Sequence, residues 1–341
     1  MKNWLKFTLF SLILAIVLVG LDIFVFTGEM KNSHYAEFFN EEEDSLDIVF
    51  MGNSTVRNGI IPAEIWNDHN ITSFSLTNSP THPEVIILAI DEIARFQSPE
   101  LVFIDITGLA YQKEEDQKTF VEEFVGAIPN SDYKEEIKSK YDYFDSETEL
   151  FANHNDYRNP EYFSSKTKIN KYLKGFTPKY GTIDVGESTI QLDNTVVELP
   201  NDGKKYLKKI LDTCAKYPEI NFVFGRMPRV ITESSVQETY ALRSAIPSIN
   251  EYGYDYLELE QYYDEIGLVS NEDFDDVIHM NYYGAVKFTK FIIPFLKEKY
   301  EIGNREHTDS VKENFNKSYK DYHSYMKKMT EKHNKKKEKS H

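Results

Sequence analysis

The chain contains a single cysteine, Cys214, among its 341 residues. One cysteine excludes an internal disulfide and a zinc site built from cysteines. We expect Cys214 to be a small buried side chain in the helix predicted around it. His34, His69, His82 and His154 lack the paired spacing of metal ligands, so the sequence predicts no metal site and no cofactor.

Positive charge is also scarce, because 39 Lys and Arg residues stand against 56 Asp and Glu residues, for a formal net charge of −17. A protein that binds nucleic acid needs a basic face to neutralise phosphates, so nucleic acid is not an expected partner. Hydrophobic residues make up 40% of the chain and aromatic residues 14%. That content supports a packed core and excludes a disordered chain.

One long apolar run, Phe7–Phe26, lies near the N-terminus. Twenty helical residues at about 1.5 Å each cover about 30 Å, the thickness of the hydrocarbon core of a bilayer. Lys2 and Lys6 precede the run, which favours a cytoplasmic N-terminus and an extracellular remainder. We expect an uncleaved, single-pass signal anchor in the cell membrane. A cleaved signal peptide is the alternative, but no small-residue cleavage site follows the run.

Composition divides the chain into segments. Residues 1–28 form the cytoplasmic N-terminus and anchor, residues 29–45 a polar acidic stalk, and residues 46–300 the main domain. Within that domain, residues 111–200 have a weaker pattern and are interpreted as an insertion, either a lid beside the site or a solvated excursion. A β-hairpin is expected near its end, over Thr182–Leu199. Residues 301–341 are polar and rich in lysine, and we expect a frayed helix or a disordered tail.

Short apolar runs in the main domain alternate with segments of helical spacing. The runs are predicted to be buried strands, at Asp47–Met51, Leu101–Ile106, Asn221–Gly225 and Tyr254–Leu259. Helices are predicted over Glu84–Phe96, Lys204–Lys216, Val236–Ala245 and Tyr282–Tyr300. This alternation predicts an α/β fold, a three-layer sandwich with a central parallel sheet. Ligands of such sheets bind beyond the carboxyl ends of the strands.

The first strand is followed directly by Gly52-Asn53-Ser54-Thr55. A serine at the tip of a strand-to-loop turn has an exposed hydroxyl and free backbone N–H groups nearby, which an oxyanion needs. The segment is not the G-x-S-x-G elbow of α/β-hydrolases. Taken alone, Ser54 is therefore a weak candidate nucleophile, and a plain turn is the alternative.

A second pattern, FDDVIHMNYYG, precedes the last helix of the main domain. Asp276 and His279 are three positions apart, so in a turn or first helical step their side chains lie on the same side. A carboxylate can then hold one imidazole nitrogen while the other faces a nucleophile. The spacing favours Asp276 over Asp275 as this carboxylate. A capping aspartate and a surface histidine are the alternative interpretation.

Together the two patterns resemble the SGNH (GDSL-type) superfamily of serine esterases and acyltransferases. The first block reads IVFMGNSTVRNGIIP, and the last, DFDDVIHMNYYGAVKFTKFI, looks like the Asp-x-x-His-x-Asn-x-x-Gly ending of bacterial membrane-anchored members. The stretches SLTNSPTHPE and FVFGRMP are similar to intermediate blocks. The resemblance covers about Asp47–Ala110 and Lys204–Tyr300 and leaves the insertion unmatched.

The resemblance implies a flavodoxin-like SGNH hydrolase fold and a catalytic triad. In it Ser54 is the nucleophile, His279 is the general base and then the general acid, and Asp276 orients His279. The backbone N–H of Ser54 is one expected oxyanion donor. Arg57 and Arg226 are further candidates for contact with substrate, although a surface ion pair is the simpler interpretation of Arg57.

The other oxyanion donors are less clear from the resemblance. Superfamily members add a glycine from the second block and an asparagine from a Gly-x-Asn-Asp third block, where this chain reads Thr107-Gly108-Leu109. Asn78 is our predicted side-chain donor. Ser75 and Ser79 are rivals, and a plain turn role is the alternative for Asn78.

The apolar N-terminal run and the resemblance together predict a membrane-anchored, extracytoplasmic serine esterase or O-acyltransferase. Its expected substrate is an acyl ester of a cell-surface glycan or wall polymer. Membrane-anchored relatives include the D-alanyl transfer protein of teichoic acid synthesis and O-acetylation enzymes of exopolysaccharides. A transferase would need a multi-spanning membrane protein as acyl donor. The alternatives are a lipase or esterase on small esters, and a catalytically inactive binding or assembly protein of the envelope.

Overall fold

The computed structural model describes residues 2–21, 34–78, 80–129, 131–144, 171–184 and 192–338. The chain divides into two compact units. The smaller comprises residues 1–39 and 122–169, and the larger comprises residues 40–121 and 170–341. The predicted site residues all belong to the larger unit.

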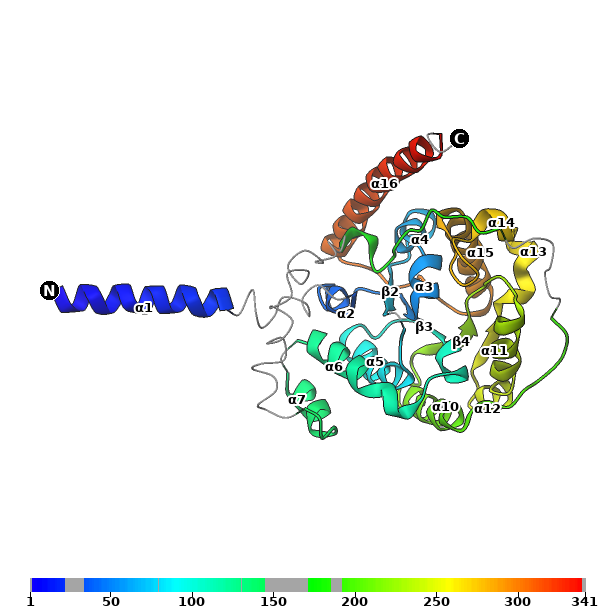
Figure 1. Cartoon of the computed structure of the whole chain (residues 1–341), viewed down its shortest axis with the longest axis horizontal. Coiled ribbons are helices and arrows are strands. Elements are labelled where there is room, and N and C mark those ends of the chain that lie inside the picture. Colours follow the sequence, from blue (N-terminus) through cyan, green and yellow to red (C-terminus); the bar gives the residue numbers. More distant parts are fainter. Residues whose placement is uncertain are drawn as a thin grey trace. The chain divides into compact units, whose positions relative to one another are not determined.

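The larger unit is built on a five-stranded sheet (Figure 1). Its strands are β1 (Ile48–Gly52), β2 (Ser73–Thr77), β3 (Leu101–Asp105), β4 (Asn221–Arg226) and β5 (Asp255–Glu258). The strand order is β2-β1-β3-β4-β5, and each neighbouring pair is parallel. The predicted α/β fold with a central parallel sheet is confirmed. Each of the four predicted strands begins and ends within one residue of its expected bounds.

The edge strand β2 was not predicted from the sequence. It reads SFSLT, with only two apolar residues, yet all five residues are buried. Its outer edge is covered, because the carbonyl of Lys174 accepts a hydrogen bond of 3.0 Å from the backbone N–H of Ser75. A short strand rich in hydroxyl groups gives no apolar signal, and a covering segment elsewhere in the chain decides its burial.

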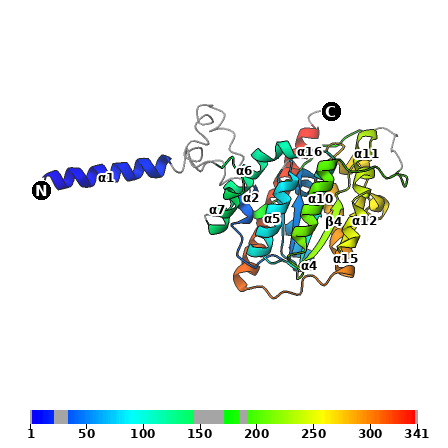
Figure 2. The same ribbon diagram turned by 90° about the horizontal axis from the view of Figure 1, so that it is seen from below.

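Helices cover both faces of the sheet (Figure 2). The helices α5 (Pro83–Phe96) and α10 (Asn201–Cys214) pack together on one side, and α4 (Pro62–His69) and α15 (Tyr282–Lys299) lie on the other. Phe288 and Ile292 of α15 share a buried apolar cluster with Ile48 and Phe50 of β1. Alternate residues of β1 therefore face α15, as the two-residue period of a strand requires.

The remaining helical elements of the core are short. They are α3 (Ser54–Gly59), η3 (Thr107–Ala110), α11 (Glu233–Arg243), α12 (Ile246–Glu251), η7 (Leu259–Tyr262), α13 (Tyr263–Ile266) and α14 (Ser270–Asp273). The predicted helices that end at Phe96, Lys216 and Tyr300 are present as α5, α10 and α15. The helix predicted over Val236–Ala245 is present as α11, which begins three residues earlier.

The predicted insertion, residues 111–200, is partly helical. Its described elements are η4 (Glu114–Asp116), α6 (Gln117–Ala127), α7 (Asp132–Ser139) and η6 (Lys171–Leu173). Nothing in these elements distinguishes a lid from a surface excursion, and residues 145–170 lie outside the described residues.

The β-hairpin expected over Thr182–Leu199 is wrong for the parts of it that the structure describes, because residues 182–184 and 192–199 form no strand. These two parts bind different elements. The backbone N–H of Ile183 donates to the carbonyl of Phe274, whereas that of Val197 donates to the carbonyl of Tyr240. The centre of the expected hairpin, residues 185–191, lies outside the described residues.

The C-terminal segment contains a long packed helix, α16 (Asp309–Glu338). Val311, Phe315, Tyr322 and Met326 form its buried face and are each at most 4% exposed. A helix was one of the two predicted alternatives, but this helix is packed against the domain, so the prediction that it is frayed or disordered is wrong for this part of the chain. These apolar residues recur at the spacing of one helical face, which is the signal for burial, but the lysine-rich composition around them favoured a tail.

Polar contacts also hold α16 against α4. The indole N–H of Trp66 donates to Asn316 Oδ1 over 3.0 Å, and the hydroxyl of Tyr322 donates to Glu64 Oε1 over 2.9 Å. The rings of Trp66 and Phe315 lie 5.5 Å apart. Before the helix, His307 Nε2 lies 2.9 Å from Asp47 Oδ2, and both side chains are buried. The C-terminal segment is thus part of the folded unit.

The structure describes only part of the expected membrane anchor, which stays a prediction. The helix α1 runs over Lys2–Leu21, and residues 22–26 of the expected anchor lie outside the described residues. Across the stretches that the structure describes, no helix is both long enough and apolar enough to cross a membrane. The expected polar stalk contains a short helix, α2 (His34–Phe38), in which Tyr35 and Phe38 are buried.

We expect Phe315→Ala to lower the free energy of unfolding by about 3 kcal/mol, because a fully buried aromatic ring is removed. Chemical denaturation of the full chain measures this value. The matched control is Lys320→Ala, which changes an exposed position of the same helix. Equal stability of both variants and the wild type would show that α16 does not pack against α4 in solution.

Candidate active site

The candidate nucleophile lies at the carboxyl edge of the sheet, where β1 ends at Gly52. Asn53 caps the following helix α3, and its Oδ1 accepts the backbone N–H of Thr55 over 2.9 Å. Ser54 is the first residue of that helix. The first N–H groups of a helix have no partner within it, so the N–H of Ser54 is suited to receive an oxyanion.

Ser54 and His279 are 225 positions apart in the chain and in contact in the structure. Ser54 Oγ lies 2.7 Å from His279 Nε2. On the opposite side of the imidazole, Nδ1 lies 2.7 Å from Asp276 Oδ2 and 2.9 Å from Oδ1. Because Nδ1 faces a carboxylate it carries the proton, which leaves Nε2 to accept the hydrogen bond of the Ser54 hydroxyl. The structure thus brings the three predicted residues together in the predicted order.

The loop between α14 and α15 holds His279 in place. Asp276 Oδ1 accepts the backbone N–H groups of Ile278 and His279, over 2.8 and 2.9 Å. The N–H of Asp275 donates to the carbonyl of His279, and Phe274 forms an antiparallel bridge with Met280. Asp276 therefore fixes both the backbone turn and the ring of the histidine that follows it.

The rest of the Asp-x-x-His-x-Asn-x-x-Gly pattern has a structural role. Asn281 caps α15, since its Oδ1 accepts the N–H groups of Tyr283 and Gly284. Its amide also donates to the carbonyl of Glu272 over 2.6 Å. A Cβ at Gly284 would lie 2.3 Å from the carbonyl oxygen of Asp273, so a side chain there would displace the loop. These residues position His279 and need not touch substrate.

The electrostatics of the pair suit general-base chemistry. Partial burial opposes ionisation of Asp276, but hydrogen bonds from His279 and from two backbone N–H groups hold its pKa at about 2. Burial lowers the pKa of His279 below 6.5, and the charges of Lys179 and Arg57 act in the same direction, against the opposing effect of Asp276. At neutral pH the histidine is therefore a neutral base beside a carboxylate, the state that proton abstraction requires.

Asp105, at the end of β3, is a site residue that the sequence reasoning missed. Its Oδ2 accepts the backbone N–H of Met227 over 3.1 Å and the hydroxyl of Thr55 over 3.2 Å. Its Oδ1 accepts the N–H of Thr107 over 2.8 Å. The buried carboxylate thus joins the carboxyl ends of β3 and β4 to the turn that carries Ser54. An acidic residue that ends an apolar strand was the available signal.

The position of Gly52 allows this close approach. A Cβ at Gly52 would lie 2.7 Å from the Cβ of Asp105 and 2.7 Å from Cγ2 of Val56. The carbonyl of Gly52 accepts the hydroxyl of Thr81 over 2.6 Å. Any side chain at Gly52 would push β1 away from β3 and move the nucleophile.

Asn78, the predicted oxyanion donor, follows β2 at the same edge. Its neighbour Thr77 pairs in register with Gly52, so Asn78 lies level with the turn that precedes Ser54. Its backbone N–H donates to the hydroxyl of Thr81 over 3.2 Å. The role of its side chain stays a prediction. The rival Ser75 lies within the strand, in register with Phe50, and the rival Ser79 is outside the described residues.

Of the two arginines predicted as candidate substrate contacts, Arg57 lies near His279 and Arg226 is buried elsewhere in the fold. Arg226 is fully buried, and its guanidinium binds Thr239, the carbonyl of Ser235, and Glu238 at 2.7 Å. It fastens β4 to α11, so the interpretation of Arg226 as a substrate contact is wrong. Arg57, on α3, is close enough to His279 to lower its pKa.

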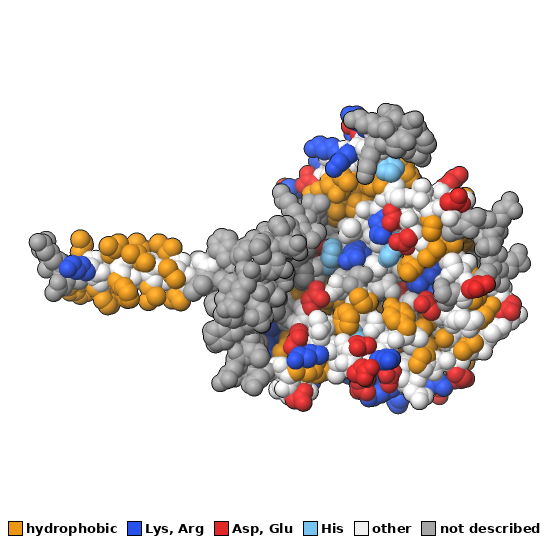
Figure 3. Space-filling view, in the orientation of Figure 1, with side chains coloured by type: hydrophobic (Ala, Val, Ile, Leu, Met, Phe, Trp, Pro, Cys, Tyr) orange, Lys and Arg blue, Asp and Glu red, His pale blue; other side chains and the backbone are white. Residues whose placement is uncertain are grey.

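Lys179 is a second site residue that the sequence reasoning missed. Its Nζ lies 2.9 Å from Asp275 Oδ2 and 3.3 Å from Asp276 Oδ2. Figure 3 shows basic, acidic and histidine side chains close together on the face that carries α3 and residues 171–184. Nothing in the sequence indicates that residue 179 meets residue 276, because Lys179 comes from the unmatched insertion.

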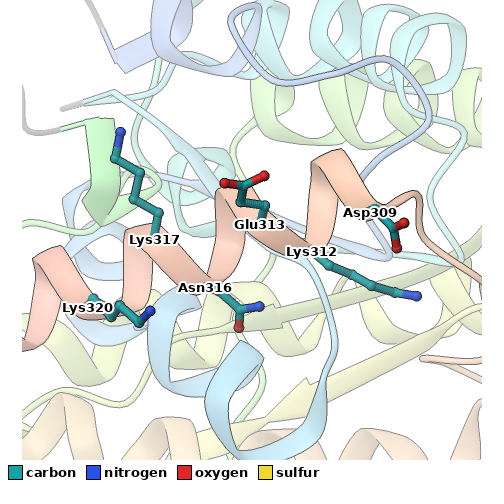
Figure 4. Close-up of a pocket in the computed structure, with 6 residues that line it drawn as sticks. All are labelled: Asp309, Lys312, Glu313, Asn316, Lys317 and Lys320. Atoms are coloured by element: carbon teal, nitrogen blue, oxygen red, sulfur yellow. The ribbon is translucent and has the colours of Figure 1, made fainter.

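A hollow along α16 lies apart from the Ser54–His279–Asp276 site. The hollow in Figure 4 is lined by charged and polar side chains of α16 alone, namely Asp309, Lys312, Glu313, Asn316, Lys317 and Lys320. Among the residues that the structure describes, no group of three or more His, Cys, Asp or Glu side chains could hold a metal ion.

Comparison with known proteins does not assign the chain to a family. No protein-family model matches the chain, and no curated protein matches it. Among solved structures, a protein from Streptococcus pneumonia whose name refers to platelet activating factor aligns over 83% of this chain and 99% of its own. The identity is 10% and the TM-score 0.41, a similarity that carries no argument. The class rests on the chain's own geometry, an α/β protein with a serine–histidine–aspartate constellation at the carboxyl edge of a parallel sheet.

We expect the reaction of Ser54 with an electrophile to slow in acid, because it needs neutral His279 as the base. The midpoint of this loss of rate should lie below pH 6.5. The folded-state pKa of His279 is lowered, so the imidazole stays neutral down to that pKa and becomes protonated below it. The rate at which a fluorophosphonate modifies Ser54, measured from pH 4.5 to 8, gives this midpoint. A midpoint clearly above 6.5 would contradict the described surroundings of His279.

Proposed function

We propose that this chain is a serine esterase or O-acyltransferase of the SGNH (GDSL-type) kind. One observation carries the proposal: Ser54 Oγ lies 2.7 Å from His279 Nε2, while Asp276 holds the other nitrogen of the ring at 2.7 Å. A hydroxyl, a base and an orienting carboxylate in this order are what nucleophilic acyl transfer needs. The lowered pKa of His279 supports its assignment as the base.

The proposed reaction has two half-reactions. The Ser54 hydroxyl attacks the acyl carbonyl as its proton passes to His279 Nε2. The backbone N–H of Ser54 stabilises the tetrahedral oxyanion, with Asn78 as the proposed second donor. As the ester C–O bond breaks, His279 returns the proton to the departing alkoxide and an acyl-Ser54 ester remains. Water or an acceptor hydroxyl then attacks that ester and gives its proton to His279. As the acyl–Ser54 bond breaks, His279 returns the proton to Ser54 Oγ, and the free acid or the new ester is released.

The proposed substrate is an acyl ester of a cell-surface glycan or wall polymer. The apolar run at residues 7–26 supports a location at the outer face of a membrane, and the resemblance of both end motifs to membrane-anchored enzymes supports the polymer. If the second half-reaction uses a sugar hydroxyl, the acyl group must come from a donor, for which a multi-spanning membrane protein is the proposed partner.

We expect the full chain to hydrolyse p-nitrophenyl acetate, a small activated ester. Ser54→Ala and His279→Ala should each lower kcat/KM by about 10²- to 10⁴-fold or more, because each removes one member of a unit that acts together. The control variant must change an exposed lysine or arginine, which the buried Arg226 is not. Lys208→Met, on the exposed face of α10, keeps the triad intact and should leave the rate unchanged. A folded wild type without hydrolysis would favour a catalytically inactive binding protein.

The proposed location is tested separately. We expect the full chain to sediment with membranes after expression, and a variant that lacks residues 1–28 to remain in the supernatant, because the apolar run is removed. Immunoblots of the two fractions give the result. Equal distribution of both forms would reject residues 7–26 as an anchor and would leave the esterase proposal untouched.

A further inference from the structure

Residues 171–184, here called the strap, cross from the edge strand to the candidate site. The carbonyl of Lys174 accepts the N–H of Ser75 in β2. Further along, the N–H of Thr177 donates to the carbonyl of Arg57 in α3, and Asn58 Nδ2 donates back to the carbonyl of Thr177 over 2.6 Å. The strap therefore follows β2 and then α3, the helix that begins with Ser54.

The strap is anchored firmly at its start. Lys174 Nζ lies 2.8 and 2.9 Å from the two carboxylate oxygens of Glu41, and both side chains are at most 6% exposed. The next residue, Gly175, has φ +87°, and a Cβ there would lie 2.1 Å from the carbonyl oxygen of Ser75. A buried ion pair and a glycine that alone allows the close approach therefore hold the first part of the strap against β2.

The strap also has fixed contacts at the catalytic loop. The carbonyl of Lys179 accepts the N–H of Tyr282 over 2.7 Å. The N–H of Gly181 donates to Asp275 Oδ1 over 2.6 Å, and its carbonyl accepts the amide of Asn281 over 3.0 Å. Asn281 is the cap of α15, so the strap and the His279 loop are joined on both sides of His279 along the chain.

Lys179 lies between these contacts, and its ammonium reaches the triad carboxylate. Asp276 Oδ2 lies 2.7 Å from His279 Nδ1 and 3.3 Å from Lys179 Nζ, so this one oxygen accepts hydrogen bonds from both side chains. Asp275 Oδ2 holds the same ammonium at 2.9 Å. The ammonium is thus shared by two neighbouring carboxylates, of which only Asp276 touches His279.

We propose that Lys179 is a positioning residue of the active site, which extends the row Ser54–His279–Asp276 by a fourth member supplied by the strap. It acts through Asp276 and touches neither substrate nor the reacting atoms. The inference rests on the proposed function, and it assigns a role to a segment that the SGNH-like motifs do not cover.

The positive charge of Lys179 offsets part of the negative charge of Asp276, so Asp276 stabilises a protonated His279 less. Three charged groups act on the imidazole: Asp276 from the loop, Lys179 from the strap and Arg57 from α3. The carboxylate of Asp275 instead binds the ammonium of Lys179. Both cations disfavour the imidazolium, so the base form persists to lower pH. Removal of the Lys179 charge raises the pKa of His279, because a repelling charge is lost and Asp276 Oδ2 then serves the imidazole alone.

The experiment compares the full chain with Lys179→Met and Lys179→Arg. The pKa of His279 is read from the NMR titration of ring-labelled histidine, with its signal assigned by its loss in His279→Gln. The acid midpoint of kcat/KM for p-nitrophenyl acetate is measured in parallel. We expect Lys179→Met to raise the pKa of His279 and the acid midpoint of kcat/KM by about half a pH unit each. At a pH well below the midpoint, this shift corresponds to about a threefold lower kcat/KM. Lys179→Arg keeps the charge and should restore the wild-type values.

The matched control is Lys208→Met, which also removes one lysine–aspartate ion pair, at 2.8 Å on α10, and should leave both values unchanged. If Lys179→Met does not fold, Lys179→Gln replaces it. An unchanged titration of His279 in a folded, neutral variant overturns the inference. A shifted titration in a chain that hydrolyses no ester upholds the coupling of Lys179 to His279 and rejects the proposed function, so the two failures are distinguishable.

Discussion

The arrangement of the site depends on the carboxylate of Asp276. It accepts the Nδ1–H of His279, the backbone N–H groups of Ile278 and His279, and one of the two ion-pair contacts of Lys179. These bonds to its ionised form hold its pKa at about 2. Through them it sets the backbone turn, the tautomer and the direction of the imidazole. The position of His279 Nε2 against Ser54 follows from those three settings.

The nucleophile is positioned independently, by the sheet. Parallel strands end at one edge, and Asp105 ties the ends of β3 and β4 to Thr55, one residue beyond Ser54. Gly52 permits the approach, because any Cβ would overlap Asp105. The two halves of the site therefore come from distant parts of the chain, and α15 joins them by packing against β1. The strap adds a second connection, from β2 to the loop of His279.

Elements with a strong local signal could be predicted from the sequence. Apolar runs predicted β1, β3, β4 and β5. The three residues that meet in space were implied by the resemblance of the Gly-Asn-Ser and Asp-x-x-His blocks, taken together, to a known superfamily, because each block alone is a weak signal. The failures have physical causes. The outer edge of β2 is covered by Lys174 from a distant segment, where its backbone accepts the N–H of Ser75. The apolar face of α16 lies among many lysines, and this composition favoured a tail. Lys179 acts through contacts across the fold, which no spacing in the sequence encodes, whereas Asp105 had one signal, its place at the end of an apolar strand.

The central claim is that Ser54 is an activated nucleophile. Intact-mass analysis of the full chain after incubation with a fluorophosphonate at pH 7.5, followed by peptide mapping, tests it most directly. We predict one adduct per chain, located on Ser54, that is absent from Ser54→Ala and strongly slowed in His279→Ala. No adduct on folded wild-type protein, or an adduct on another residue that persists in Ser54→Ala, would contradict the account.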